Sequence, residues 1–154
     1  MNLTFSGKFD NTIIIEEEFR APIDKLYHVW TQADQLKNWF MAEEGFVVTS
    51  VAVDLKVEGN YRLGVTAQPD TPEMEISGIF QKITPSEYLA YTWNVAVLEG
   101  KKTLVTVEFH TNGTGTKILL THGEFDNKKQ TQLHAQGWIG CIAHLQKYLQ
   151  SSLH

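Results

Sequence analysis

Two histidines and one glutamate in the C-terminal third have the types and spacing to form a chemical site. His122 alternates with Ile118 and Leu120 in a strand-like stretch, so we expect its ring to point to the same buried side. Glu124 follows next on that face, and His134 begins a long helical pattern. Imidazole and carboxylate groups bind zinc and serve as general acids and bases. The three side chains are therefore candidates for a metal-binding or acid–base cluster.

The spacing of these groups argues against a metal. Structural zinc sites are usually rich in cysteine or carry histidine pairs four residues apart, and this chain has one cysteine and no such pair. We therefore predict no metal and no other cofactor. The alternative interpretation of His122 is a histidine at the edge of the core, whose ring is satisfied by a backbone carbonyl or a carboxylate.

Nucleophilic catalysis has little support in the sequence. Ser77 lies inside a strand pattern and not in the G-x-S-x-G turn that exposes a catalytic serine. Cys141 lies on an apolar helical stripe, where a thiol is usually buried and inert. No catalytic residue is assigned, and a binding function is favoured over an enzymatic one. If the domain does catalyse a reaction, His122 or Glu17 is the expected titratable group.

Charge and hydropathy narrow the classes of partner. The chain has 13 basic and 18 acidic residues, a formal net charge of -5, and its densest basic segments are the pairs Lys101-Lys102 and Lys128-Lys129. A nucleic acid is therefore not the expected partner. No segment reaches the run of about 20 apolar residues needed for membrane insertion. The single cysteine and the lack of a signal-peptide pattern in residues 1–10 predict a cytoplasmic protein.

The elements that would position these groups follow from hydrophobic periodicity. Residues 12–20 alternate as a strand, and Ala21-Pro22 ends it before two short amphipathic helices, the second of which Asp34 is expected to cap. Six further strands are predicted at residues 46–52, 60–68, 73–84, 88–95, 102–111 and 116–124. Their short links indicate antiparallel pairing in a meander. Residues 1–154 are predicted to form a single α+β domain.

A long helix is predicted at residues 128–149. Its apolar stripe consists of Leu133, Trp138, Cys141, Ile142, Leu145, Tyr148 and Leu149. Gly137 and Gly140 interrupt the stripe, and each costs about 1 kcal/mol relative to alanine inside a helix. Such glycines indicate close packing or free space beside the helix. A sheet that curls around this helix could therefore enclose a cavity.

Several short motifs, each weak alone, occur in a characteristic order. They are Phe19-Arg20-Ala21-Pro22, Val29-Trp30, Trp39, Gly78 before Pro85, Tyr91-Thr92-Trp93, Thr116 with Leu119 to His122, and Gly137-Trp138. By their order the chain resembles the SRPBCC superfamily over residues 12–149, and within it the branch related to the C-terminal domain of the activator of heat-shock-protein ATPase. The resemblance implies a START-like, helix-grip fold. In that fold a curved antiparallel sheet wraps around a long C-terminal helix, two short helices follow the first strand, and a hydrophobic pocket lies between sheet and helix.

The residues expected to line such a pocket are mostly aromatic. They are Trp39, Phe40, Tyr61, Phe80, Tyr91, Trp93, His122, His134, Trp138 and Ile142. For each, the competing interpretation is an ordinary core position, because a domain of this size buries several aromatic rings. The strand at residues 88–95 leaves a choice open, since Tyr91 and Trp93 share one face with Leu89 while Thr92 lies on the other.

The function favoured by these patterns is the binding of an apolar or amphipathic small molecule. Two alternatives stay open: a cyclase-like or dehydrase-like enzyme acting on polyketide-type substrates, and a stress protein that interacts with a chaperone. The chaperone alternative is weakened because the stretch before residue 12 has no room for the additional domain of the activator. A monomer or a homodimer is expected, with the exposed face of the first strand and the loop at residues 67–73 as candidate contacts.

Overall fold

The computed structural model describes residues 2–6, 11–40, 46–66 and 72–152. In these residues eight strands form one antiparallel sheet in the order β1-β2-β8-β7-β6-β5-β4-β3. The strands are β1 Asn2–Ser6, β2 Thr12–Phe19, β3 Val47–Val53, β4 Asn60–Thr66, β5 Met74–Thr84, β6 Tyr88–Val95, β7 Thr103–Asn112 and β8 Gly115–Gly123. Helices α1 (Ile23–Thr31) and α2 (Ala33–Trp39) follow β2, the 3-10 turn η1 (Ala96–Leu98) follows β6, and α3 (Lys128–Ser152) follows β8.

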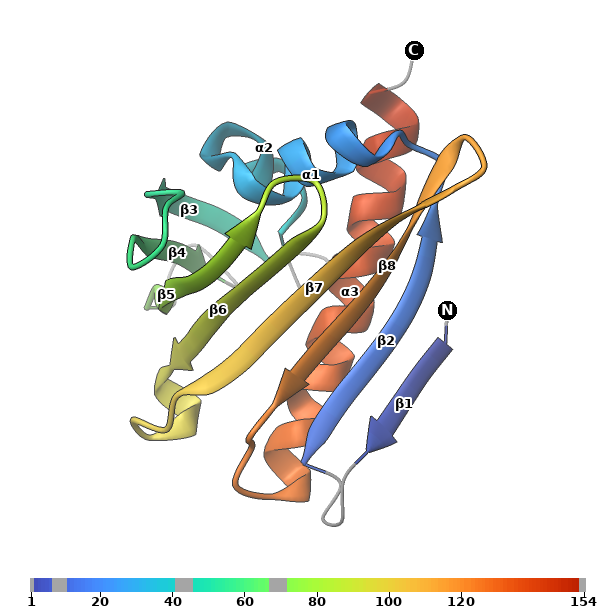
Figure 1. Ribbon diagram of the computed structural model, residues 1–154. Coiled ribbons are helices and arrows are strands. Elements are labelled where there is room, and N and C mark those ends of the chain that lie inside the picture. The colour runs from blue at the N-terminus through green and yellow to red at the C-terminus, as the bar shows by residue number, and fades with distance from the viewer. Residues whose placement is uncertain (1, 7–10, 41–45, 67–71, 153–154) are drawn as a thin grey trace.

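The sheet curves around α3, with α1 and α2 covering one end (Figure 1). Strands β3 to β8 pair with their neighbours in sequence, and β2 pairs with β8. Because β2 and β3 lie far apart in the sheet, the chain between them must cross the molecule, and α1 and α2 make that crossing. The arrangement confirms the predicted α+β helix-grip fold.

The transition from β2 into the two short helices is set by local chemistry. Pro22 has extended backbone and stands at the N-cap of α1, while the Thr116 hydroxyl of β8 donates to the carbonyl of Ala21 at 2.7 Å. The predicted cap by Asp34 is wrong, because α2 begins at Ala33 with Gln32 at its N-cap and has no side-chain cap. Asp34 instead lies in the first turn, where its negative charge is attracted to the positive end of the helix dipole.

The sequence did not predict β1. This strand pairs antiparallel with β2, from Asn2 opposite Glu16 to Ser6 opposite Thr12. Its five residues are too few to show a clear period, and its place in the sheet depends on pairing with β2. One backbone edge of β2 is therefore occupied, which reduces what that strand could offer to a second copy. Of the other candidate contact, residues 67–71 lie outside the described part of the chain.

The face of the sheet toward α3 is set by alternation. In β8 every second residue is buried, including Ile118 and Leu120. In β6 the set of Leu89, Tyr91 and Trp93 is buried while Thr92 is partly exposed, so the first set faces the core. This resolves the choice that the sequence left open.

The apolar stripe of α3 is buried along most of its length. Ile142, Leu145 and Leu149 are almost fully covered, as predicted. Leu133 departs from the prediction, because 54% of its surface is exposed. It lies near the start of the helix and belongs to the lining of a cavity.

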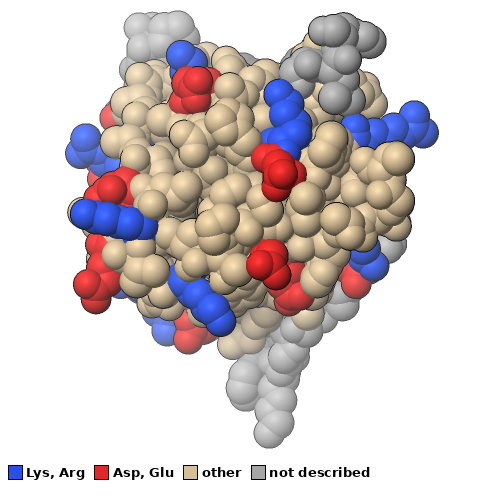
Figure 2. Space-filling view, turned by 45° about the horizontal axis from the view of Figure 1, so that its top comes forward, with Lys and Arg blue, Asp and Glu red and all other residues tan. Residues whose placement is uncertain are grey.

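Charges are spread over the surface of the described residues. On the face shown in Figure 2, acidic and basic side chains alternate around broad uncharged areas. Some of these charges form exposed ion pairs, such as that between Lys117 and Glu16, whose charged atoms lie 3.4 Å apart. Among the described residues, no helix is long and apolar enough to cross a membrane.

Candidate ligand pocket

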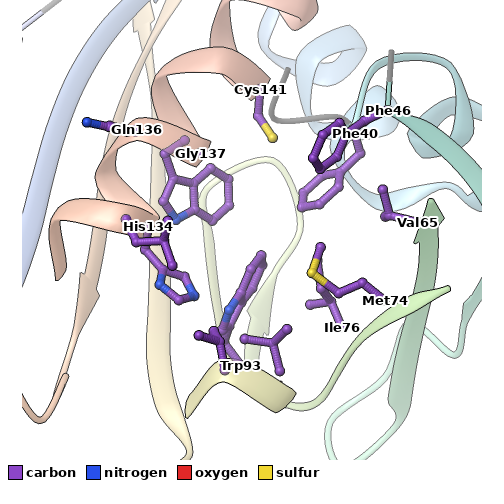
Figure 3. A pocket seen from close by; sticks show the side chains of 14 residues that line it. Phe40, Phe46, Val65, Met74, Ile76, Trp93, His134, Gln136, Gly137 and Cys141 are labelled. Atoms are coloured by element: carbon purple, nitrogen blue, oxygen red, sulfur yellow. The ribbon is translucent and has the colours of Figure 1, made fainter. Parts of the chain in front are cut away.

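A cavity of about 290 Å³ lies between α3 and the part of the sheet formed by β4, β5 and β6. Its walls are almost entirely apolar (Figure 3). The lining residues are Phe40, Phe46, Val65, Met74, Ile76, Trp93, Val95, Val97, Leu133, His134, Gln136, Gly137, Trp138 and Cys141. Among these there is no lysine, arginine, aspartate or glutamate, so the described walls carry no permanent charge.

Four of the predicted pocket residues line this cavity: Phe40, Trp93, His134 and Trp138. Three others surround a second, much smaller void of about 30 Å³ beneath α1 and α2, and these are Tyr61, Phe80 and Tyr91. Phe40 and Trp93 border both spaces, so these two rings form the partition between them.

The remaining three predicted residues, Trp39, His122 and Ile142, border neither space. All three are completely buried. Trp39 donates its indole hydrogen to the carbonyl of Val29 at 2.8 Å, which fixes it within the helical layer. Ile142 packs in the filled part of the core. Their burial is that of ordinary core residues.

Ten lining residues were not predicted. On α3, Leu133, Gly137 and Cys141 follow one another at intervals of four, so a single helical face brings them to the cavity. On the sheet, Val95 shares the face of Trp93 and stands opposite Ile76 in the register. The helical spacing and the period of two were the signals that could have found these five residues.

His122 lies behind the cavity wall in a chain of buried hydrogen bonds. The indole of Trp138 donates to His122 Nδ1 at 2.9 Å, so that nitrogen is an acceptor. The other nitrogen, Nε2, therefore carries the hydrogen and donates to Thr103 Oγ1 at 2.7 Å. The Thr103 hydroxyl in turn donates to the carbonyl of Trp93 at 3.2 Å. Every donor in this chain has one acceptor.

This chain of bonds requires a neutral histidine. Burial lowers the pKa of His122 well below its ordinary value of 6.5, and the neighbouring His134 ring lowers this pKa further. A proton on Nδ1 would also point at the indole hydrogen of Trp138. Because the bonds join α3 to β8, β7 and β6, they hold the ring of Trp138 and the backbone of Trp93 in place, and the two rings lie with centroids 5.5 Å apart. His122 is thus a positioning residue behind two cavity walls.

The predicted cluster of His122, Glu124 and His134 does not form. The two histidine rings lie 5.4 Å apart, but Glu124 is exposed and follows the end of β8 with a φ of 72°. The turn out of the strand directs this residue away from the face that alternation had predicted. Within the described ranges, no three His, Cys, Asp or Glu side chains are grouped so that they could hold a metal ion.

Two polar groups stand at one end of the cavity. His134 Nδ1 bonds to the carbonyl of Gln130 at 3.0 Å, and because a carbonyl only accepts, Nδ1 carries the hydrogen and Nε2 is left with a lone pair. Burial lowers the pKa of His134, which favours this neutral form. The Trp93 indole nitrogen is buried without an acceptor among the described residues. Figure 3 shows that nitrogen on the edge of the indole that faces His134.

Solved structures share this fold at low sequence identity. An AHSA1-like protein from Aeromonas hydrophila is 22% identical, with a TM-score of 0.78 over 92% of this chain and 93% of its own. The AHSA1 protein from Silicibacter pomeroyi is 18% identical, with a TM-score of 0.80 over 92% of this chain and 99% of its own. Protein CV1439 from Chromobacterium violaceum is 20% identical, with a TM-score of 0.78 over 90% and 96%.

The family of this chain is assigned by a family model, and the solved structures agree with it in fold. The model described as "Activator of Hsp90 ATPase homolog 1-like protein" matches residues 20–150, which include both short helices, strands β3 to β8 and nearly all of α3. The comparison with curated proteins gave no match. The chain belongs to the activator of Hsp90 ATPase homolog 1-like family, a part of the SRPBCC superfamily.

Proposed function

We propose that this domain binds an uncharged, largely apolar small molecule in the cavity between α3 and the sheet. The observation that carries the proposal is an apolar space of about 290 Å³, which is at the small end of the range of known ligand pockets. An ordinary protein core is filled to the density of an organic crystal, so an apolar space of this size beside the core offers room for an apolar molecule.

The walls determine what kind of molecule would be stabilised. Each 100 Å² of apolar ligand surface removed from water contributes about 2.5 kcal/mol. A charged group would lose its hydration without gaining a partner of opposite charge, because the described lining has no ionic side chain. These terms favour a compact neutral molecule of one or two rings over a fatty acid or a nucleotide.

A calorimetric titration with naphthalene-type probes tests the proposal, with Gly137→Leu as the blocking variant. Gly137 lines the cavity, so a leucine there fills part of the space that a ligand would occupy. Ala143→Leu adds the same side chain to an exposed position of the same helix and is the matched control. We expect Gly137→Leu to weaken probe binding at least tenfold and Ala143→Leu to leave it unchanged.

The proposal fails if the wild-type protein binds none of the probes, or if Gly137→Leu and Ala143→Leu bind them equally. Circular dichroism establishes that each variant is folded before its affinity is compared. If Gly137→Leu does not fold, Val95→Phe fills the cavity from the opposite wall. Its affinity is then compared with that of the Ala143→Leu control.

The enzymatic alternative would use the same cavity. His122 and Glu17 were the expected acid–base groups, and neither belongs to the described lining. The titratable side chains of the described lining are His134 and Cys141. A binding function accounts for the geometry without further assumptions. The roles with a chaperone or in a stress response stay predictions from the family resemblance. The cytoplasmic location and the monomeric or dimeric state stay predictions from the sequence.

A further inference from the structure

We infer that the cavity takes a neutral ring compound with a hydroxyl group, and that this hydroxyl is held between the Trp93 indole nitrogen and His134. The inference rests on the proposed binding function and adds to it the chemical class of the ligand. It depends on a buried donor, a facing acceptor and the aromatic character of the surrounding walls.

The donor is the indole N–H of Trp93. Only 6% of this residue is exposed, and its nitrogen has no hydrogen-bond acceptor among the described residues. A buried donor left unpaired destabilises the folded protein, because it has lost its hydrogen bond to water. The other three tryptophans each have an acceptor: Trp30 bonds to Tyr91 Oη, Trp39 to a backbone carbonyl and Trp138 to His122. Trp93 is the exception; its ring borders the cavity, and its nitrogen is covered, so a ligand reaches this donor when a neighbouring side chain moves aside.

The acceptor is the Nε2 lone pair of His134. The bond from Nδ1 to Gln130 fixes the tautomer, so Nε2 can accept but cannot donate while the ring is neutral. The rings of Trp93 and His134 have centroids 6.1 Å apart and planes 75° apart. The two polar groups thus come from opposite walls of the cavity, one on β6 and one on α3.

A hydroxyl group matches this pair better than other small polar groups do. It accepts one hydrogen bond through its lone pairs and donates one through its hydrogen. A carboxylate or an ether oxygen accepts from Trp93 but offers nothing to His134. A carboxylate would also be buried without a lysine or arginine in the described lining. An ammonium group donates only, so it would leave the Trp93 hydrogen unpaired.

The aromatic walls of the cavity indicate that the rest of the ligand is also aromatic. Trp93 and Trp138 lie with centroids 5.5 Å apart and planes tilted by 43°, and Phe40 contacts each of them at a centroid distance of 6.1 Å. Three aromatic rings therefore converge near the two polar groups. Stacked or edge-on contacts with a ring stabilise a bound aromatic molecule beyond what burial of its area contributes. An aromatic alcohol gains more from these walls than an aliphatic one.

The test compares four probes of one size: 2-naphthol, 2-methoxynaphthalene, naphthalene and 2-naphthoate. Titration calorimetry gives each dissociation constant for the wild-type protein. We expect 2-naphthol to bind about tenfold more tightly than naphthalene, which corresponds to about 1.4 kcal/mol for hydrogen bonds of ordinary net strength. The methoxy compound should fall between them because it accepts from Trp93 but cannot donate to His134. The naphthoate should bind most weakly.

Two variants locate the preference. Trp93→Phe keeps an aromatic wall and removes the donor, and His134→Phe keeps a ring and removes the acceptor. Either variant should reduce the preference for 2-naphthol over naphthalene to less than twofold while naphthalene still binds. Since Thr103 bonds to the backbone carbonyl of residue 93, Trp93→Phe leaves the buried chain of hydrogen bonds intact. If one variant does not fold, the other variant and the order of the four affinities for the wild-type protein still test the inference.

Equal affinities for 2-naphthol and naphthalene would overturn this inference but leave the proposed function standing. That result would mean that water fills the position between Trp93 and His134 equally well. Tightest binding of 2-naphthoate, or a 2-naphthol preference that survives both variants, would also overturn it. Absence of binding by every probe would overturn the proposed function itself.

Discussion

The half of the sheet formed by β2, β7 and β8 differs from the half formed by β3, β4 and β5 in how regularly its strands pair. In the first, the closed half, the register of β8 with both neighbours runs without a shift, and burial alternates residue by residue. In the second, the open half, the register shifts between Val48 and Ser50 and again between Phe80 and Lys82. The cavity borders the open half.

The difference shows how a protein of this size keeps a space beside an otherwise filled core. A regular twisted sheet presents an even row of side chains, which α3 covers with residues such as Ile142 and Leu145. The register shifts lie in strands that border the cavity, and Ile76 of β5 belongs to its lining. Because a β-bulge bends its strand and increases the local twist, we attribute the space to this irregular pairing.

The largest effect is expected at Gly78 of β5, in the open half, because a side chain there would have no room. A β-carbon at this position would lie 1.8 Å from the carbonyl oxygen of Thr92 and 2.7 Å from the ring of Tyr61, whose hydroxyl donates to that same oxygen at 2.6 Å. Backbone cannot move away cheaply, so Gly78→Ala should destabilise the protein by at least about 3 kcal/mol. Urea unfolding measures the loss.

Gly123→Ala is the matched control in the closed half. A β-carbon there would come within 3.1 Å of the Thr12 hydroxyl, which is a side chain that can rotate. We expect a change below about 1 kcal/mol, as for a surface substitution with a mild contact. Equal losses for the two alanine variants would contradict the distinction between a strained open half and a regular closed half.

The second effect compares the same truncation in the filled core and beside the cavity. Ile142→Ala, on the part of α3 that packs in the filled core, creates a new cavity and should cost about 3–4 kcal/mol. Ile76→Ala enlarges a space that already exists, and because Ile76 lacks neighbours on its cavity side, we expect a cost of about 1–2 kcal/mol. Thermal or urea unfolding gives both values. A larger cost for Ile76→Ala would mean that the cavity is closed in solution.

The third effect concerns the pH dependence that His122 contributes. Because the pKa of His122 is lowered in the folded protein, the unfolded chain binds more protons below about pH 6.5. Its contribution to stability is present above that pH and is lost as the pH falls, by up to about 1.4 kcal/mol per pH unit. His122→Phe should be less stable at pH 8 by about 2–3 kcal/mol, since Trp138 and Thr103 lose partners.

The same variant should lose stability less steeply than the wild type between pH 6.5 and 5. Part of the slope stays, because burial lowers the pKa of His134 as well and that ring then titrates in the same direction. Unfolding in urea at four pH values measures the two slopes. Parallel curves for the wild type and His122→Phe would show that His122 is not the neutral, fully bonded histidine described above.

The smallest effect on stability is expected at Leu133, on the mouth of the cavity. Leu133→Ser should change the free energy of unfolding by less than about 0.5 kcal/mol, because the side chain is largely exposed. The variant should still weaken binding of 2-naphthol by a few fold, since Leu133 belongs to the lining. Calorimetry and urea unfolding on the same sample separate the two effects. Unchanged affinity would place the ligand deeper than the mouth.

Much of the fold was accessible from the sequence because the strongest patterns are local. The alternation that ends in His122 and the helical stripe around Ile142 both predicted which side is buried. The short strand β1 was missed because its position depends on pairing with β2. The exposure of Leu133 was missed because helical spacing identifies a face but not whether a strand lies opposite.

The site was less accessible than the fold. Aromatic residues were chosen as pocket candidates, yet Trp39 is an ordinary core residue and the aliphatic Val95 lines the cavity. Period and residue type indicate which side chains point inward, but a gap between two walls depends on how far apart the backbones lie. We attribute that distance to the register shifts in β3 and β5, which the sequence does not display.

The most direct test of ligand binding beside the open half is a titration with 2-naphthol, in which the four indole N–H signals are followed in a ¹H–¹⁵N spectrum. We predict a large shift for Trp93, whose N–H lacks an acceptor among the described residues. Smaller shifts are expected for Trp30, Trp39 and Trp138, whose N–H groups already have an acceptor. Assignment by tryptophan-to-phenylalanine variants identifies each signal. An unmoved Trp93 signal at saturating 2-naphthol would contradict the account.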